Sequence, residues 1–336
     1  VYAYLASQES LRQADLDSEH CSSGRMGIVI GSTIGSVDTI QDFFRDFLTD
    51  RSVERTKSTT FFQIMNHSCA ANIAQSLGIG GRILAPSAAC STGCQAIGYG
   101  FEMIAFGKQD FALCGGADEF HPLFSATFDM VNAASFNFND QPKETPRPFD
   151  CDRDGIVCAE GSGILILESL ESAIEREATI LAEISGFATV ASPDNIARPD
   201  EHSMVKCMIM ALKDAGIEPG EVDYINAHAT ATEQGDIAES RAINKVFGEN
   251  VPVSSLKGHI GHTMAASGSI EVAATIEMMK GGYLVPTLNL ENIDELCKNI
   301  RHIKGVENSR VKTVIKNSFA FGGVNSTIVL RRYKND

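Results

Sequence analysis

Residues 87–93 read Ser-Ala-Ala-Cys-Ser-Thr-Gly, and this stretch decides the fold that we expect. A short apolar run with strand character precedes it at residues 81–85, and a long apolar run with helix character follows it at residues 95–105. Small residues surround Cys90, so the backbone can come close to whatever the sulfur attacks. A cysteine in the first turn of a helix lies near the positive end of the helix dipole, which favours the thiolate. The stretch therefore predicts a strand–turn–helix unit that presents a nucleophile.

Strand-like apolar runs recur along the chain, at residues 26–31, 111–115, 163–168, 222–226, 311–315 and 326–330. Helical patterns lie between many of them, for example at residues 205–215 and 237–246. Strands that alternate with helices are typical of an α/β fold whose sheets are buried on both faces. We therefore expect a layered α/β protein.

A faint internal repeat relates two parts of the chain. The Gly, Glu and Gly at positions 93, 102 and 107 recur at positions 268, 277 and 282, each 175 positions further on. Both segments read as a helix that begins near a Thr-Gly or Ser-Gly pair and ends at glycine. The match is either a coincidence or the trace of a duplicated fold, with halves at residues 1–170 and 171–336. In a duplicated fold Cys90 corresponds to Ala265, so only the first half carries a nucleophile.

Composition excludes several classes of protein. The chain has 336 residues, 43% of them hydrophobic and 21% charged, and a formal net charge of −15, which argues against nucleic acid as a partner. Nine scattered cysteines indicate a reduced, cytoplasmic protein rather than a disulfide-stapled one. The sequence contains no apolar stretch that could span a bilayer, no signal peptide and no GxGxxG motif for a dinucleotide cofactor. Residues 1–5 already have helix character without an initiating Met, so we expect an N-terminal segment to be missing.

His228 stands at the end of a predicted strand. Side chains at that position of an α/β sheet often line a site, although a lone histidine there can be purely structural. In the loop that follows, Thr230 and Thr232 alternate, so an extended backbone places both hydroxyls on one side. That pair could hold a polar, amide-rich ligand arm.

Residues 255–268 combine Lys257, His259 and His262 with many small residues that leave room for a ligand. The two histidines have the spacing of an HxxH metal pair, but no matching ligand cluster lies nearby in the sequence, and we expect no metal. Lys257 near His262 would keep that imidazole neutral. Glu271 falls in an apolar helical run, where it either pairs with Lys257 or reaches solvent.

Residues 317–325 join two strand-like runs through Gly322 and Gly323. This segment can be a simple β-hairpin turn. It can also be a loop that offers a backbone N–H to an oxyanion, with Phe321 as a movable cover.

The four segments, in this order, resemble the 3-oxoacyl-acyl-carrier-protein synthases I and II, which are condensing enzymes of the thiolase-like superfamily. The elements that carry the resemblance are Ala89-Cys90-Ser91, His228 with Thr230 and Thr232, Lys257 with His262 five residues on, and residues 319–323. The resemblance covers essentially the whole chain. It implies a duplicated α/β/α/β/α fold, and the family's additional N-terminal segment agrees with the one that we expect to be missing, which would remove a strand of the first half.

The resemblance also implies a reaction. Cys90 takes an acyl group from a carrier-protein thioester, and His228 and His262 bind the malonyl thioester carbonyl during decarboxylation. The resulting carbanion attacks the acyl group on Cys90 and releases a 3-oxoacyl product for fatty-acid or polyene/polyketide chain elongation. No bound cofactor is implied, because the substrates travel on the phosphopantetheine arm of acyl carrier protein.

The remaining roles follow from the same resemblance. Backbone N–H groups of Cys90 and Phe321 would form the oxyanion hole, Lys257 and Glu271 would orient the histidines, and Thr230 and Thr232 would contact the phosphopantetheine arm. Phe319 is expected at the substrate. Two positions depart from the family pattern: Ala229 replaces a Gly, and Ile156 stands where a Phe usually borders the acyl pocket, so we expect a slightly reshaped acyl site. Residues 227–233 look more like synthases of polyene-type specialised pathways than like housekeeping ones.

Acyl carrier protein is acidic, and so is this chain, so docking requires a local basic patch. Arg51, Arg55 and Lys57 are our candidates for that patch, although they can equally be a solvated face. The resemblance further implies a homodimer, or a heterodimer with a related subunit. We expect neither nucleic acid nor membrane as a partner.

Three other functions compete with a condensing enzyme. A non-catalytic partner subunit of the chain-length-factor type lacks the active cysteine, whereas this chain has Cys90 and both histidines. A thiolase acting on coenzyme A esters would use a second cysteine near the late Gly-rich segment, and residues 319–325 contain none. A scaffold protein with a decayed site would have no reason to retain the whole set.

Overall fold

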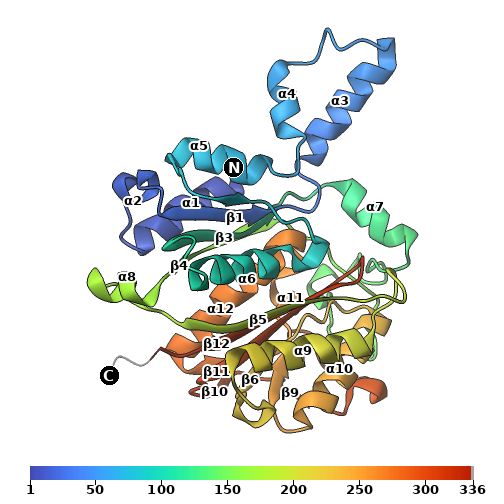
Figure 1. Cartoon of the computed structure of the whole chain (residues 1–336). Coiled ribbons are helices and arrows are strands. Elements are labelled where there is room, and N and C mark those ends of the chain that lie inside the picture. The colour runs from blue at the N-terminus through green and yellow to red at the C-terminus, as the bar shows by residue number, and fades with distance from the viewer. Residues whose placement is uncertain (334–336) are drawn as a thin grey trace.

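The computed structural model describes residues 1–333 and has two sheets separated by helices (Figure 1). The first sheet has the strand order β2-β1-β3-β4, in which β1 is parallel to β2 and β3, and β4 is antiparallel to β3. Its strands are β1 (Met26–Gly31), β2 (Ile83–Leu84), β3 (Phe111–Asp118) and β4 (Gly161–Glu168).

The second sheet has the order β5-β12-β11-β6-β7-β9. Within it, β6 is parallel to β11 and β7, while β12 is antiparallel to β11 and β5. Its strands are β5 (Glu183–Ala191), β6 (Tyr224–Asn226), β7 (Pro252–Ser254), β9 (Arg301–His302), β11 (Thr313–Ala320) and β12 (Val324–Arg331). A further small pair joins β8 (Tyr283–Leu284) to β10 (Glu307–Asn308). The run β7-β6-β11-β12 repeats the order and the directions of β2-β1-β3-β4.

Helices form the other three layers (Figure 1). The buried central layer consists of α6 (Thr92–Ala105) and α12 (Ser267–Gly281), which lie between the sheets. The outer layers contain α1 (Tyr2–Gln13) and α5 (Ser68–Leu77) on one side, and α9 (Glu201–Ala215) and α10 (Glu233–Phe247) on the other. Shorter helices are α2 (Ser18–Ser22), α7 (Pro122–Met130), α8 (Leu170–Glu175) and α11 (Lys257–Ile260). The expected α/β/α/β/α architecture is confirmed.

The repeat seen in the sequence is a repeat of structure. A short 3-10 turn precedes α6 at Ala89–Ser91 and precedes α12 at Met264–Ala266. The first residue of each turn has a left-handed backbone, with φ of 46° at Ala89 and 50° at Met264. These two residues are again 175 positions apart, so the offset reflects a duplicated fold rather than coincidence.

The two central helices cross at their first turns, and glycines make this close approach possible. A Cβ atom on Gly93 would lie 2.6 Å from the Ala265 carbonyl oxygen, and one on Gly268 would lie 2.6 Å from the Cys94 nitrogen. Either distance is far below van der Waals contact, so a larger residue would force the helices apart. The crossing brings the turn that carries Cys90 next to the segment that carries His262.

Some predicted strands have different bounds in the structure. The run at residues 81–85 forms only the two-residue edge strand β2, whose side chains are exposed. The run at residues 222–226 starts as a strand only at Tyr224, and the run that begins near residue 311 extends as β11 to Ala320. Hydrophobic pattern locates strands well, but pairing with a neighbour sets where each one ends.

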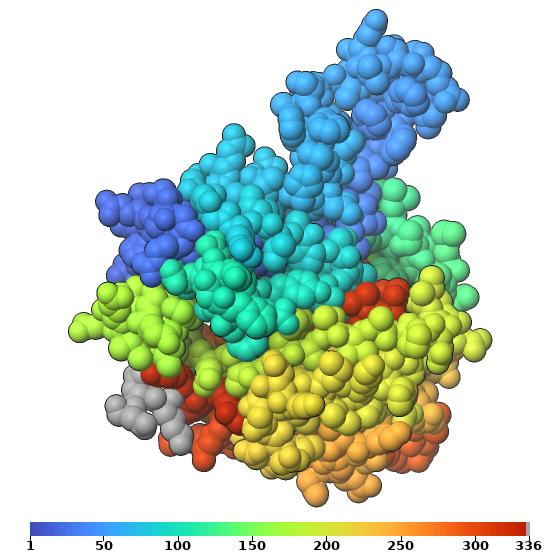
Figure 2. All heavy atoms as spheres, viewed as in Figure 1, coloured from blue at the N-terminus to red at the C-terminus, as the bar shows by residue number. Residues whose placement is uncertain are grey.

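Two helices lie apart from the layered body. Helices α3 (Val37–Asp50) and α4 (Ser58–Gln63) form an arm that projects from the first half (Figures 1 and 2). Within residues 1–333, no helix combines the length and the apolar character needed to cross a lipid bilayer.

Candidate active site

Cys90 lies in the 3-10 turn that enters α6 and is buried among elements of both halves. The turn is anchored to the β11–β12 hairpin by Ser91, whose hydroxyl lies 2.7 Å from the Ser318 carbonyl oxygen and 2.9 Å from the Val324 carbonyl oxygen. The Cys90 Sγ atom lies 2.9 Å from His262 Nε2. A thiol and an imidazole at this distance can exchange a proton directly.

The dipole argument for a resting thiolate at Cys90 is wrong. Burial raises the pKa of the Cys90 thiol to about 12, and the nearby Lys257 cation only partly opposes that rise. The helix begins at Thr92, one residue beyond the 3-10 turn, and an end dipole is a weaker influence than full desolvation. Cys90 is therefore a neutral thiol at rest, and His262 Nε2 is the imidazole nitrogen within reach of its proton.

His262 is held on both sides of its ring. Its Nδ1 atom lies 2.9 Å from Ser267 Oγ, and its backbone N–H donates to the Val157 carbonyl at 2.8 Å. A hydroxyl can donate or accept, so Ser267 supports either tautomer of the ring. Burial lowers the pKa of His262 well below its usual value, and the Lys257 charge lowers it further. Lys257 therefore acts in the expected direction, but burial is the larger cause of the lowered pKa.

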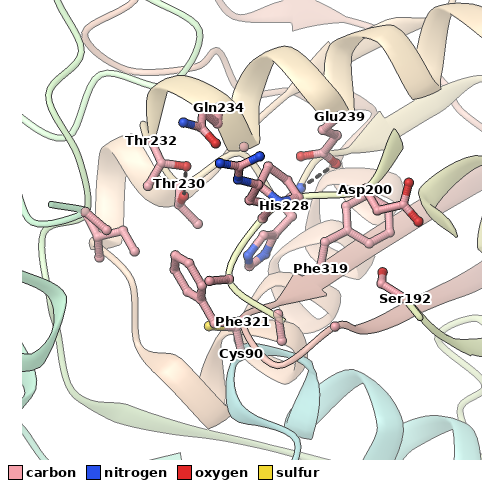
Figure 3. Close-up of a pocket in the computed structure, with 18 of the residues that line it drawn as sticks. Cys90, Ser192, Asp200, His228, Thr230, Thr232, Gln234, Glu239, Phe319 and Phe321 are labelled. Carbon is pink, nitrogen blue, oxygen red and sulfur yellow. Dashed lines mark hydrogen bonds between the residues drawn. The ribbon is translucent and has the colours of Figure 1, made fainter. Parts of the chain in front are cut away.

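His228 faces the same space from the end of β6 (Figure 3). Its ring meets the His262 ring edge to face, with 5.5 Å between the centroids. Burial and then the Lys257 charge lower the pKa of His228 well below its usual value. Within the described chain its Nδ1 atom has no hydrogen-bond partner. Two neutral imidazoles thus converge beside one buried thiol.

The backbone around His228 is fixed by a carboxylate that the sequence analysis did not select. Glu239, on α10, accepts the N–H of His228 at 2.8 Å and the N–H of Ala229 at 2.7 Å (Figure 3). The signal in the sequence was its place on the buried face of an amphipathic helix directly after the histidine loop. A carboxylate at such a position needs donors, and the nearest backbone supplies them.

The predicted pair of Lys257 and Glu271 is confirmed. Lys257 Nζ lies 2.8 Å from Glu271 Oε1, and both side chains are buried, so Glu271 does not reach solvent. The second oxygen, Oε2, lies 2.8 Å from Nζ of Lys316, a residue that the sequence analysis missed. Burial raises the pKa of Glu271, but Lys257 and Lys316 together bring it below its usual value.

Cys90 stands between two cavities. The larger has a volume of about 350 Å³ and is lined by both histidines and by Thr230 and Thr232. The smaller has a volume of about 120 Å³, is almost wholly apolar, and is lined by Phe124, Phe128 and Met264 among others. Phe321 borders both cavities, and its ring centroid lies 6.0 Å from that of Phe128. One cavity therefore suits a polar arm and the other an apolar chain.

The remaining predicted site residues line the larger cavity (Figure 3). The hydroxyls of Thr230 and Thr232 are 3.1 Å apart, which confirms that they face one side. Phe319 packs beside His228, and Ile156 is buried in the wall. Residues 321–323 form the turn of the β11–β12 hairpin, so the hairpin interpretation is confirmed and the same turn brings Phe321 to the thiol.

The three docking candidates lie away from the cavities. Arg51, Arg55 and Lys57 are exposed on the segment between α3 and α4, at the end of the arm (Figure 1). Arg55 is paired with Asp50 at 3.1 Å, so part of its charge is already compensated. Their role in docking stays a prediction.

The structure separates the two histidines of the HxxH pattern. His259 Nε2 lies 2.8 Å from the Pro286 carbonyl oxygen, whereas His262 faces the thiol. Ligand atoms of Cys90, His228 and His262 do lie within 4.8 Å of one another, a spacing that could hold an ion. The expectation that no metal takes part stays a prediction.

A nucleophilic cysteine, two neutral histidines and a buried Lys–Glu pair on a duplicated five-layer α/β fold define a thiolase-like condensing enzyme. The models of two family domains match the chain: "Beta-ketoacyl synthase, N-terminal domain" at residues 1–173 and "Beta-ketoacyl synthase, C-terminal domain" at residues 181–291. The chain belongs to the beta-ketoacyl synthase family, and it is a condensing acyltransferase.

Individual relatives agree with this assignment. The chain is 34% identical to 3-oxoacyl-[acyl-carrier-protein] synthase 1 of Haemophilus influenzae, over 99% of this chain and 82% of the relative. It is 36% identical to 3-oxoacyl-[acyl-carrier-protein] synthase 2 of a Synechocystis species, over 99% of this chain and 81% of the relative. A crystal structure of a beta-ketoacyl synthase from Burkholderia phymatum superposes with a TM-score of 0.96 at 42% identity, over 99% of this chain and 82% of the other.

Proposed function

We propose that this chain condenses an acyl group held on Cys90 with the malonyl group of an acyl carrier protein, releasing CO2 and a 3-oxoacyl product. The observation that carries the proposal is the 2.9 Å contact between Cys90 Sγ and His262 Nε2 at the junction of the two cavities, with His228 beside it.

In the first half-reaction His262 acts as a general base. As the Cys90 sulfur attacks the thioester carbonyl, its proton passes to His262 Nε2. Backbone N–H groups of Cys90 and Phe321 stabilise the oxyanion. The carbon–sulfur bond to the carrier breaks, the carrier thiolate takes the proton from His262, and the acyl group stays on Cys90. Its apolar chain enters the smaller cavity beside Phe128.

In the second half-reaction the histidines act as hydrogen-bond donors. The malonyl arm enters the larger cavity, where Thr230 and Thr232 contact its amides. The bond to the carboxylate breaks, CO2 leaves, and the electron pair forms an enolate that His228 and His262 stabilise. The enolate carbon attacks the acyl carbonyl, the bond to Cys90 sulfur breaks, and the departing thiolate takes up a proton from solvent, which restores the neutral thiol. Neutral imidazoles suit this step because they donate a hydrogen bond without transferring a full charge.

The experiment that tests the function uses purified chain with an acyl carrier protein loaded with acyl or malonyl groups. A 3-oxoacyl carrier-protein product is expected only when both loaded carriers are present, and its formation should be accompanied by faster release of CO2 than malonyl carrier protein gives alone. Comparing acyl groups of increasing length shows which chain the smaller cavity accepts. If the malonyl carrier is never consumed in the presence of any acyl donor, the proposed reaction is wrong.

The partner is an acyl carrier protein, and a related complex supports this. A structure of a type II PKS acyl-carrier protein with its ketosynthase superposes with a TM-score of 0.94 at 32% identity, over 99% of this chain and 84% of the other. We place the docking patch at Arg51, Arg55 and Lys57, and the reaction in the cytoplasm, where the scattered cysteines stay reduced.

Charge reversal on the arm should weaken carrier-protein binding. Because carrier proteins are acidic, the double variant Arg55→Glu/Lys57→Glu is expected to raise the carrier-protein KM about tenfold with little change in kcat. Lys245→Glu is the matched control, since Lys245 is also exposed but lies in the last turn of α10. An unchanged KM for the double variant, measured at low salt, would remove these residues from the docking surface.

The arm also supports the proposal of a dimer. It exposes a set of large apolar side chains, each more than half exposed: Phe44, Leu48, Phe61 and Phe62. An apolar set of this kind marks an interface. A second copy of the chain or a related subunit would cover it, and a structure described as a ketosynthase/chain length factor superposes with a TM-score of 0.90 at 30% identity. Light scattering on the chain alone distinguishes the two: a homodimer has twice the mass of 36.1 kDa, whereas a chain that needs a related subunit does not.

A further inference from the structure

Lys316 is a buried cation that none of the roles above uses. It lies in β11, where its strand partners are Asn226 of β6 and Ile328 of β12. Its side chain has no exposed surface. A lysine is almost never fully buried without an ionic partner, because removing an ammonium from water costs several kcal/mol. The position of this lysine therefore needs an explanation in its surroundings.

Its nearest carboxylate is shared with a second lysine. Lys316 Nζ lies 2.8 Å from Glu271 Oε2, and Lys257 Nζ lies 2.8 Å from Glu271 Oε1. Lys316 Nζ also donates to the backbone carbonyl of Asn317. One carboxylate balances only one of these two charges, so the group as a whole remains positive unless another anion faces it.

Glu239 is the other buried carboxyl group of this region, and Asn317 links it to Lys316, because Lys316 Nζ donates to the Asn317 carbonyl and Asn317 Nδ2 reaches Glu239. Burial raises the pKa of Glu239, and the N–H groups of His228 and Ala229, followed by the Lys316 charge, oppose this rise only in part. Its two oxygens accept the N–H groups of His228 and Ala229, and Oε1 also lies 3.3 Å from Asn317 Nδ2. Both oxygens therefore act as acceptors. The ionised carboxylate can fill this role, whereas a protonated one would direct an O–H at a donor.

We propose that Lys316 is a positioning residue for the decarboxylation step: its ammonium pairs with Glu271 directly and, through Asn317, supports the ionised form of Glu239. Glu271 then keeps Lys257 beside the histidines, and Glu239 keeps the backbone of His228 in place. This inference rests on the proposed roles of the two histidines in the malonyl half-reaction.

The effect of Lys316 should fall on one half-reaction. Cys90 is held by His262, and no hydrogen bond or ion pair among residues 1–333 joins Lys316 to either of them. Losing the ammonium leaves Glu271 with Lys257 alone and removes a cation that favours the ionised form of Glu239, whose oxygens hold the loop of His228. We therefore expect decarboxylation to suffer and acylation of Cys90 to persist.

The test uses two neutral variants of the full chain, Lys316→Met and Lys316→Gln, and the charged variant Lys316→Arg. CO2 release from malonyl carrier protein measures one half-reaction, and the mass gained by Cys90 from acyl carrier protein measures the other. We expect the neutral variants to lose CO2 release about 100-fold and to keep the acylation rate within about threefold, since a small misplacement of a catalytic group typically costs about 100-fold. Lys316→Arg should release CO2 at least about tenfold faster than the neutral variants. Lys312→Met, at an exposed lysine just before β11, is the matched control.

A pH profile separates positioning from mere stability. With one cation fewer, the ionised forms of Glu271 and Glu239 are less stabilised, so their pKa values rise. CO2 release by the neutral variants should therefore increase with pH more steeply than that of the unaltered chain, whereas buried Asp236, whose pKa burial raises to about 7, is common to both and does not produce this difference.

Three outcomes would overturn the inference. The first is release of CO2 by the neutral variants at the rate of the unaltered chain. The second is loss of both half-reactions in equal proportion, and the third is failure of both neutral variants to fold. Each of these three results would leave Lys316 with no role in positioning. If instead the unaltered chain releases no CO2, the proposed function itself is wrong, and that result is visible before any variant is made.

Discussion

Replacing Cys90 with alanine is expected to abolish acyl transfer. The intact mass of the unaltered chain, mixed with acyl carrier protein, should rise by one acyl group, and the mass of Cys90→Ala should not rise. Condensation should fall at least about 1000-fold, because loss of a nucleophile removes a covalent step that no remaining group replaces. Slow release of CO2 from malonyl carrier protein should persist, since His228 and His262 remain in place.

Cys94→Ala is the matched control for this prediction. Cys94 is also buried, lies one helical turn beyond Cys90, and has its pKa raised by burial to about 12 in the same way. Among residues 1–333 the hydrogen bond from a cysteine sulfur to His262 Nε2 belongs to Cys90 and not to Cys94, so replacing Cys94 should leave the acyl adduct intact. An adduct that survives in Cys90→Ala would transfer the role of nucleophile to another thiol, with Cys158 the first to test because it lies in the segment that pairs with His262.

The sequence was sufficient for the fold and for most of the site because both depend on local pattern. The glycines of the repeat mark the entry and exit of two helices, and those helices turn out to cross at Gly93 and Gly268. Cys90 and His228 follow predicted strands, and the ends of strands meet in one place in a layered α/β fold. The order of these segments along the chain was therefore enough to predict that they meet in one site.

What the sequence did not disclose depends on partners that are distant along the chain. Lys316 lies just beyond the run predicted as a strand at residues 311–315, and only its contact with Glu271 shows that it is buried with an anion. Glu239 likewise acquires its role from the backbone of His228. The Cys90 thiolate failed as a prediction because a helix dipole can be inferred from sequence, whereas the desolvation that outweighs it is a property of the packed interior.

Separate replacement of the two histidines is expected to divide the reaction into its halves. His228→Ala should lower CO2 release about 100- to 10,000-fold, the range typical for a positioned imidazole, and should leave acylation of Cys90 within a few-fold of the unaltered chain. The reason is geometric: His228 faces the larger cavity, and its Nδ1 atom has no partner among the described residues. His262→Ala should lower both halves, because His262 Nε2 contacts the Cys90 sulfur.

The pH dependence of CO2 release provides a second, independent test of the two histidines. Because burial and Lys257 lower the pKa of both histidines, the neutral forms that donate to the enolate persist below pH 6.5, where a free imidazole would gain a proton. CO2 release by the unaltered chain should accordingly stay flat as the pH falls through about 6.5 and decline only further toward acid. A rate that halves near pH 6.5 would mean that a solvent-exposed histidine controls the step. Equal losses of both halves in His228→Ala would mean that the ring supports the structure of the site rather than the enolate.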